Sequence, residues 1–502
     1  MKNWIAILAG TALVACSAGA QDSTVQAEDE GDGARVYETT GQVSAGGRTI
    51  RYRTVAGETI LRNEDGEPIA SIFSTAYIQQ GNGDPRERPV AFIFNGGPGS
   101  ASLWLHMGVF GPRRVVLPAD ASDDGAAPYN VVANEHSILD VADIVFVDPV
   151  GTGWSRPMGE SEGSEFWGVR EDASSLGAFI RLWLTENQRW NSPKFLLGES
   201  YGTTRIAALM NELQGGWTDV SINGVALIST VLDFRFDDTS EGNDIGFSGL
   251  LPGFAATAWY HDRIDRSAWN DDLPTFIEAS REFTYSTYMP ALMRGVSLPE
   301  ADRRAIAAEM SSFIGLSEDY LMRANLRVTL GRFMRELLRD QGRSVGRLDS
   351  RYTGPEADGV GEGPDYDPSA YGIDGAYTAA MLDYFTRDLG VDITDEYSVI
   401  DIPTSRGWDR STGQGAAYTN VGPWLARAMR QNSDLDVLVA QGYYDLATPF
   451  FAAELMFNQP GFDPARVHFR YYESGHMMYV HEPSLEEVAD HVRALIRDEL
   501  ED

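Results

Sequence analysis

Cysteine is almost absent from this sequence, since Cys16 is the only one in 502 residues. The rest of the chain therefore cannot form a disulfide, supply a thiol nucleophile or build a cysteine-based zinc site. The sequence also lacks a His-Glu-x-x-His motif and a P-loop. It thus indicates neither a metal site nor a cofactor.

Basic residues are scarce as well. Lysine and arginine number 40 against 74 aspartates and glutamates, which gives a formal net charge of −34. An acidic field repels phosphate backbones, so nucleic acid is not an expected partner, and we interpret most of this charge as a solvated surface. With 43% hydrophobic residues, the chain can bury a large core in several domains or in one domain with an insertion.

Long apolar runs are missing except for a short one at the N-terminus. The apolar run at 4–15 follows a lysine and is too short to span a membrane, which is typical of a signal peptide. It ends in Leu-Val-Ala-Cys at 13–16, which resembles the lipobox of bacterial lipoproteins, where the cysteine is lipidated. Cleavage after the Ala-Gly-Ala at 18–20 is the alternative. We expect 1–20 to be a signal peptide with Cys16 as the candidate lipidation site.

This signal indicates an exported protein of the periplasm or cell envelope, in contact with a membrane only through a possible lipid anchor. Residues 21–35 are polar and rich in Asp, Glu and Gly, and are expected to form a flexible tether. From 36 to 80, apolar and polar residues alternate around turn signals at 46–47 and 64–66. This pattern predicts antiparallel hairpins at the start of a sheet.

Continuous apolar runs replace the alternation from residue 90 onward. Short, wholly apolar strands that alternate with helices are typical of a parallel sheet covered on both faces. The sequence therefore predicts an α/β fold with a mostly parallel central sheet. The strand-like runs are 90–94, 144–147, 195–197, 225–228 and 437–439, and the clearest intervening helices are 173–183 and 203–213.

The strand signal fades between residues 231 and 430. We interpret 231–430 as a largely helical cap insertion between two parts of the core, 36–230 and 431–502; a separate domain is the alternative. The expected helices are 276–292, 300–314, 316–340 and 376–389, with a Gly- and Asp-rich loop at 354–371.

Three serines lie in Gly-x-Ser-x-Gly motifs, at Ser161, Ser200 and Ser344. Only Ser200 follows an apolar run and precedes a helix-like stretch, which is the strand–turn–helix order of a nucleophile elbow. The other two serines are expected in loops. Ser200 is therefore the candidate nucleophile.

A serine hydroxyl needs a histidine to accept its proton. His476 follows the strand-like run 467–472 and is the candidate base, with His481 as its rival. Asp445 directly follows the run 437–439 and lies between the serine and the histidine in chain order, as an orienting acid should. The alternative for Asp445 is an ordinary turn residue.

Glycines follow the apolar run 90–94 in the segment Asn-Gly-Gly-Pro-Gly-Ser. Such glycines let backbone N–H groups approach a developing oxyanion. We expect the N–H groups of Gly97 and Tyr201 to form the oxyanion hole; an ordinary glycine-rich turn is the alternative.

Taken together, these motifs resemble the serine carboxypeptidase family, peptidase family S10, here as an exported bacterial member. The resemblance spans about residues 89 to 480, and its motifs occur in the family's order at 95–99, 148–155, 198–201, 442–445 and 475–477. It implies an α/β-hydrolase fold and removal of C-terminal residues from peptide substrates through an acyl-enzyme. It also implies that Asn95 and Glu199 bind the substrate's free carboxylate.

The chain departs from the family pattern at several positions. Ser100 replaces a cysteine, Gly202-Thr203 stands where Ala-Gly is usual, and Val109 stands where a second carboxylate-binding glutamate is expected. The last change bears on the carboxypeptidase assignment and not on the triad. An esterase or acyltransferase with the same triad is one alternative, and a non-catalytic envelope binding protein is another.

Overall fold

The structure is a computed structural model that describes residues 26–30, 33–81, 83–214, 218–236, 238–413, 415 and 417–500. The expected signal peptide, with Cys16, lies outside the described residues. Within the expected tether, residues 26–30 form a strand whose backbone pairs antiparallel with residues 34–38. Part of that segment is therefore an edge of the sheet.

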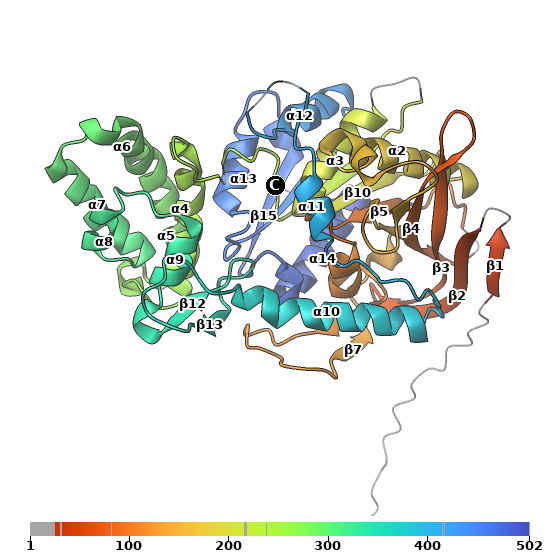
Figure 1. Cartoon of the computed structure of the whole chain (residues 1–502), viewed down its shortest axis with the longest axis horizontal. Helices are drawn as coiled ribbons and strands as arrows, with labels where there is room; N and C mark the ends of the chain where they lie inside the picture. Colours follow the sequence, from red (N-terminus) through yellow and green to blue (C-terminus); the bar gives the residue numbers. More distant parts are fainter. Residues whose placement is uncertain are drawn as a thin grey trace, which may run out of the picture.

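An 11-stranded sheet runs through the molecule (Figure 1). Its strands lie in the order β1 (Gln26–Glu30), β2 (Ala34–Ala45), β3 (Arg48–Arg62), β4 (Pro68–Gln79), β8 (Asp143–Val147), β5 (Val90–Phe94), β10 (Lys194–Glu199), β11 (Gly224–Ile228), β14 (Asp436–Gly442) and β15 (Val467–Tyr472), while β9 (Arg156–Pro157) pairs with β4. Pairing is antiparallel from β1 to β8 and parallel from β8 to β15.

The parallel strands β5, β8, β10 and β11 are buried on both faces, which explains their largely apolar sequences, whereas β15 forms the partly exposed edge of the sheet. In β5, Val90, Phe92 and Phe94 enter one core cluster, whereas Ala91 and Ile93 enter the other. Helices α2 (Val169–Glu186), α3 (Tyr201–Leu213) and α12 (Gly422–Gln431) supply the first cluster, and α10 (Pro368–Arg387) and α14 (Glu482–Arg497) the second. The predicted parallel sheet with helices on both faces is confirmed.

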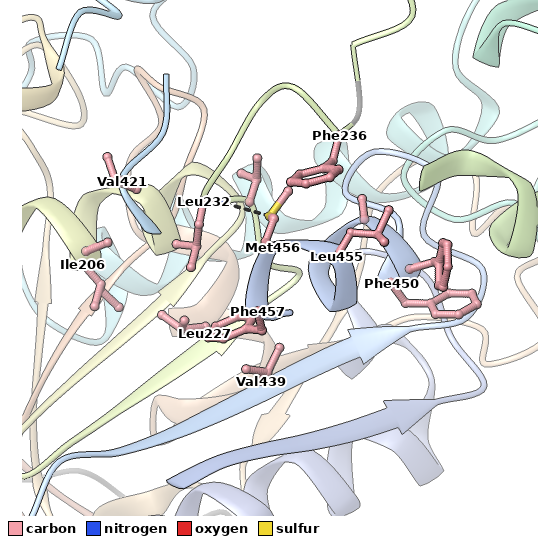
Figure 2. Packing of buried hydrophobic residues seen from close by; sticks show 14 of the residues in the cluster. Ile206, Leu227, Leu232, Phe236, Val421, Val439, Phe450, Leu455, Met456 and Phe457 are labelled. Atoms are coloured by element: carbon pink, nitrogen blue, oxygen red, sulfur yellow. Dashed lines mark hydrogen bonds between the residues drawn. The ribbon is translucent and has the colours of Figure 1, made fainter. Parts of the chain in front are cut away.

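Helix α13 (Phe450–Phe457) follows β14 in the chain and packs against the sheet. Figure 2 shows Phe457 packed beside Leu227 of β11 and Val439 of β14. The Leu232 N–H also contacts the Met456 sulfur at 3.2 Å. This packing holds the chain on both sides of the loop that carries Asp445.

A group of helices lies to one side of the sheet, drawn in green in Figure 1. It comprises α4 (Asp244–Tyr260), α5 (Leu273–Phe283), α6 (Met289–Arg294), α7 (Glu300–Ile314), α8 (Glu318–Arg323) and α9 (Leu330–Glu336). The expected helix 300–314 is α7, but the expected helix 316–340 is divided into α8 and α9. The division falls at Asn325 and Leu326, whose φ angles of 51° and 63° are left-handed and cannot continue a helix.

The remainder of 231–430 returns to the sheet. Helix α12 packs against α3, and α10 packs against the α1 segment (Leu103–Leu105) that follows β5. Helix α10 also begins earlier than expected, because Asp367 caps its N-terminus through a hydrogen bond to the Ser369 N–H. In the part of the chain that the structure describes, no helix is long and apolar enough to cross a membrane.

Candidate active site

Ser200 occupies a sharp turn between β10 and α3. Its φ of 62° and ψ of −129° lie outside the ordinary regions for a residue with a side chain, and it remains partly exposed. A Cβ at Gly198 would lie 2.6 Å from the Gly202 carbonyl oxygen, and one at Gly202 would lie 2.8 Å from that of Phe94. The flanking glycines therefore make the turn possible, and the turn holds the hydroxyl above the end of the sheet.

Asp445 and His476 form a hydrogen-bonded pair at the ends of neighbouring strands. Asp445 follows β14 and His476 follows β15, and Nδ1 of the histidine lies 2.8 Å from Oδ2 of the aspartate. The aspartate is fully buried and also accepts bonds from the N–H groups of Ala447 and Thr448, at 2.8 and 3.0 Å, and from the Thr448 hydroxyl at 2.7 Å. This network fixes the imidazole with Nε2 left free of Asp445.

The charges around His476 favour its protonated form. Burial by itself would lower the pKa of the imidazole, but the adjacent Asp445 carboxylate and Glu199 more than offset it, so the pKa is raised. An imidazolium formed during a reaction would therefore be stabilised at this position.

The serine and histidine loops meet at the end of β11. The Ser200 N–H donates to the carbonyl of Ile228, the last residue of β11, at 2.9 Å. Ser229, which follows Ile228, donates its hydroxyl to the His476 carbonyl at 2.6 Å. Among the described residues, no hydrogen bond joins the Ser200 hydroxyl to His476. In unliganded enzymes such bonds are often long and tighten only when substrate is bound.

The rival histidine is placed differently. His481 precedes α14, and its Nδ1 lies 2.8 Å from the Ser484 hydroxyl. The other two motif serines also lie apart from the end of β10. The Ser161 N–H closes a turn onto the Met158 carbonyl, and Ser344 is buried within the short strand β12 (Arg343–Val345), not in the expected loop.

The glycine-rich loop after β5 packs directly on the turn at Ser200. A Cβ at Gly96 would lie 2.6 Å from the Tyr201 nitrogen, and Gly97 has a φ of 102° that favours glycine. Tyr201 is the first residue of α3, so its N–H has no carbonyl of a preceding turn to bind and lies at the positive end of the helix dipole. This arrangement suits the role expected for the N–H groups of Gly97 and Tyr201.

Asn95 and Glu199 form a buried pair beside the nucleophile. The Asn95 amide donates to Oε1 of Glu199 at 3.0 Å, whereas Oε2 has no hydrogen-bond partner among the described residues. Burial raises the pKa of Glu199 to about 7. Near neutral pH this carboxyl group is thus often protonated and able to donate a hydrogen bond.

Arg205 on α3 holds the Asn95 backbone, a contact that the sequence motifs do not predict. Its Nη1 donates to the Asn95 carbonyl at 2.5 Å and its Nε to Asp172 of α2 at 2.6 Å, with the guanidinium fully buried. Asp148, from the motif at 148–155, similarly accepts the Ser102 N–H at 2.8 Å. Both contacts fix the glycine-rich loop from outside the turn.

A short hairpin braces the acid and the base. The loop between β12 and β13 (Thr353–Pro355) accepts the His476 N–H at the Leu348 carbonyl, at 2.6 Å, and the Leu446 N–H at the Arg347 carbonyl, at 3.1 Å. Sequence patterns give no signal for such contacts, because backbone carbonyls make them.

Among the described residues, no group of three or more His, Cys, Asp or Glu side chains could hold a metal ion.

Comparison with known proteins agrees with the motifs. Residues 74–287 match the model of the serine carboxypeptidase family. Serine carboxypeptidase-like 46 of Arabidopsis thaliana is 25% identical over 186 residues, which cover 35% of this chain and 36% of the relative. Serine carboxypeptidase-like 10 of the same plant is 28% identical over 145 residues, covering 28% of this chain and 31% of the relative. The matches thus span about a third of the relatives' length.

The fold is shared over a longer range. The crystal structure of Kex1ΔP, a prohormone-processing carboxypeptidase from Saccharomyces cerevisiae, matches with a TM-score of 0.57 and 15% identity, covering 90% of this chain and 93% of that one. The α/β-hydrolase fold is therefore confirmed. The curated relatives are plant proteins and give no support for a bacterial source. The family model and these relatives thus show that this chain is similar to the serine carboxypeptidases.

Proposed function

We propose that this protein is a serine carboxypeptidase that removes C-terminal residues from peptides. The observation that carries the proposal is the buried pair of Asn95 and Glu199 directly beside Ser200, with one carboxyl oxygen unpaired. A neutral carboxyl group and an amide that face the nucleophile suit a substrate that ends in a carboxylate. An ester or an internal peptide bond has no group that needs them.

In the proposed acylation step, the Ser200 hydroxyl attacks the carbonyl carbon of the last peptide bond and its proton passes to His476 Nε2. Asp445 holds Nδ1 protonated and stabilises the imidazolium. The N–H groups of Gly97 and Tyr201 bind the oxyanion of the tetrahedral intermediate. His476 then protonates the leaving amine, the C–N bond breaks, and the terminal residue leaves.

Deacylation repeats the sequence with water. His476 takes a proton from the water, the hydroxide adds to the acyl carbonyl, and the Ser200 oxygen leaves with the proton that His476 returns. Both halves of the cycle use the same hydrogen bond between Asp445 and His476.

Matched peptides test this proposal. Pairs with identical sequence and either a free or an amidated C-terminus are incubated with the protein, and released amino acids or amino acid amides are measured. We expect release from the free acids at a rate at least tenfold higher than from the amides. Equal cleavage of both, or activity on small esters alone, would replace the carboxypeptidase by an esterase or acyltransferase with the same triad.

The pKa of Glu199 predicts how substrate binding depends on pH. Because burial raises this pKa to about 7, the group is neutral below that pH and negatively charged above it. An ionised Glu199 repels the substrate carboxylate, so KM for free-acid peptides should rise about tenfold for each pH unit above 7. In Glu199→Gln the side chain stays neutral and the rise should disappear. A wild-type KM that stays constant from pH 6 to pH 9 would contradict this role.

We also propose that the protein is exported and carries a lipid at Cys16. The support is the sequence at 13–16, since residues 1–25 lie outside the described structure. In a bacterial host, wild-type protein should incorporate labelled palmitate and stay with the membrane fraction, whereas Cys16→Ser should lose both properties. Cleavage of the wild type after Ala20 without any label would favour a secreted, unlipidated form.

A further inference from the structure

Two unpaired polar atoms lie buried together beside the nucleophile. Glu199 is 4% exposed and Tyr479 is 3% exposed; Oε2 of the glutamate and the tyrosine hydroxyl interact with each other, yet neither makes a hydrogen bond of ordinary geometry among the described residues. The hydroxyl lies next to both Glu199 and Asn95. Buried polar groups without partners are uncommon in folded proteins, and when they cluster at a reactive residue they suggest a missing ligand.

The tyrosine ring is held so that it cannot turn away. Tyr479 lies in a single helical turn, Met478–Val480, three residues after the candidate base. Its ring fills the space over Gly108, where a Cβ would come within 2.3 Å of the ring carbons, and a second buried tyrosine, Tyr377, lies 6.3 Å away between ring centroids. Val109 beside this glycine is fully buried and adds no polar side-chain atom. The Tyr479 hydroxyl therefore supplies polarity where the Val109 side chain supplies none, beside the hydroxyl of Tyr377.

The chemistry of these groups matches a carboxylate. Oε1 of Glu199 already accepts from Asn95, so the proton of the neutral acid is available on Oε2. A tyrosine hydroxyl can donate a second hydrogen bond. Two donors side by side suit the two oxygens of one carboxylate better than a single carbonyl oxygen.

We propose that Tyr479 is a substrate-binding residue whose hydroxyl donates a hydrogen bond to the terminal carboxylate of the peptide, together with Glu199. This inference rests on the proposed carboxypeptidase function and names a residue that determines its specificity for a free C-terminus. It predicts a role in discrimination between free and amidated C-termini, which a tyrosine that only fills space would not have.

Tyr479→Phe tests the inference, because it removes the hydroxyl and keeps the ring against Gly108. For free-acid peptides we expect KM to rise tenfold or more, as is usual for loss of a hydrogen bond to a charged group, with kcat changed much less. The ratio of kcat/KM between free-acid and amidated peptides should fall by about the same factor. Tyr288→Phe is the matched control, since Tyr288 is buried among the helices α4 to α9 and bonds the Leu326 carbonyl; its ratio should equal that of the wild type.

Two other outcomes separate this inference from the function on which it rests. If the wild type releases terminal residues and Tyr479→Phe keeps the full ratio, the inference is wrong and the carboxypeptidase stands. If the wild type cleaves only p-nitrophenyl esters, the carboxypeptidase is wrong, and inhibition of ester cleavage by N-acetylphenylalanine decides the role of Tyr479. N-acetylphenylalanine amide serves as the uncharged control inhibitor. If N-acetylphenylalanine inhibits Tyr479→Phe tenfold more weakly than it inhibits the wild type, and the amide inhibits the two proteins equally, the role of Tyr479 in carboxylate binding stands. If N-acetylphenylalanine inhibits the two proteins equally, that role is wrong.

Discussion

Ser200→Ala should lower kcat for peptide hydrolysis by roughly a millionfold while the protein remains folded. The substitution removes the attacking oxygen, and the neighbouring Thr203 hydroxyl is held on the Ser200 carbonyl at 2.7 Å. The φ of 62° at this position disfavours alanine as it does serine, so stability should change little. Release of amino acids from a short free-acid peptide, measured with thermal unfolding on the same samples, checks both statements.

The other serines in Gly-x-Ser-x-Gly motifs supply the control for this prediction. Ser161→Ala changes the same motif in a turn away from β10 and should keep the wild-type rate. Loss of activity in Ser161→Ala, with activity kept in Ser200→Ala, would identify Ser161 as the nucleophile and contradict the assignment of Ser200.

Asp445→Asn should lower kcat by about 10⁴-fold, the second largest effect that we expect. An asparagine fits the same space and its carbonyl oxygen can still accept the N–H groups of Ala447 and Thr448. Its amide, however, would donate to Nδ1 of His476, which places the imidazole proton on Nε2. In that tautomer the imidazole cannot accept the proton of Ser200.

The measurement is kcat for a free-acid peptide, accompanied by the NMR signal of the His476 ring protons. Asp244→Asn is the control, because Asp244 forms an ion pair with Arg327 at 2.7 Å among the helices α4 to α9, far from the base in the chain. It should keep wild-type kcat. An Asp445→Asn variant with kcat within tenfold of the wild type would mean that Asp445 does not set the tautomer.

Much of the core fold could be predicted from the sequence because its strands are buried on both faces. The apolar runs 90–94 and 225–228 fall in β5 and β11, which are buried along their whole length. The division between α8 and α9 could not be predicted, because neither glycine nor proline marks the left-handed residues Asn325 and Leu326. Periodicity also shows that α10 has an apolar face without showing which surface it covers, and so the return of α10 to the sheet was not foreseen.

The candidate site follows the same logic. Ser200, Asp445 and His476 each lie in the loop or turn that follows a parallel strand, so an argument from strand ends places them at one edge of the sheet, and the structure joins the acid and base there. The contacts that hold these residues in place could not be predicted from the sequence. The carbonyl of Leu348, which accepts the His476 N–H, carries no side-chain signal, and Tyr479 becomes notable only because the structure buries its hydroxyl beside Glu199 and Asn95.

The central claim is that the Asp445–His476 pair activates Ser200, and covalent labelling tests it most directly. The wild-type protein is treated with a fluorophosphonate, digested, and mapped by mass spectrometry. We predict a single phosphonylated site on Ser200, with labelling slowed at least a thousandfold in His476→Ala. Labelling of another serine, or equal rates in the two proteins, would contradict the account.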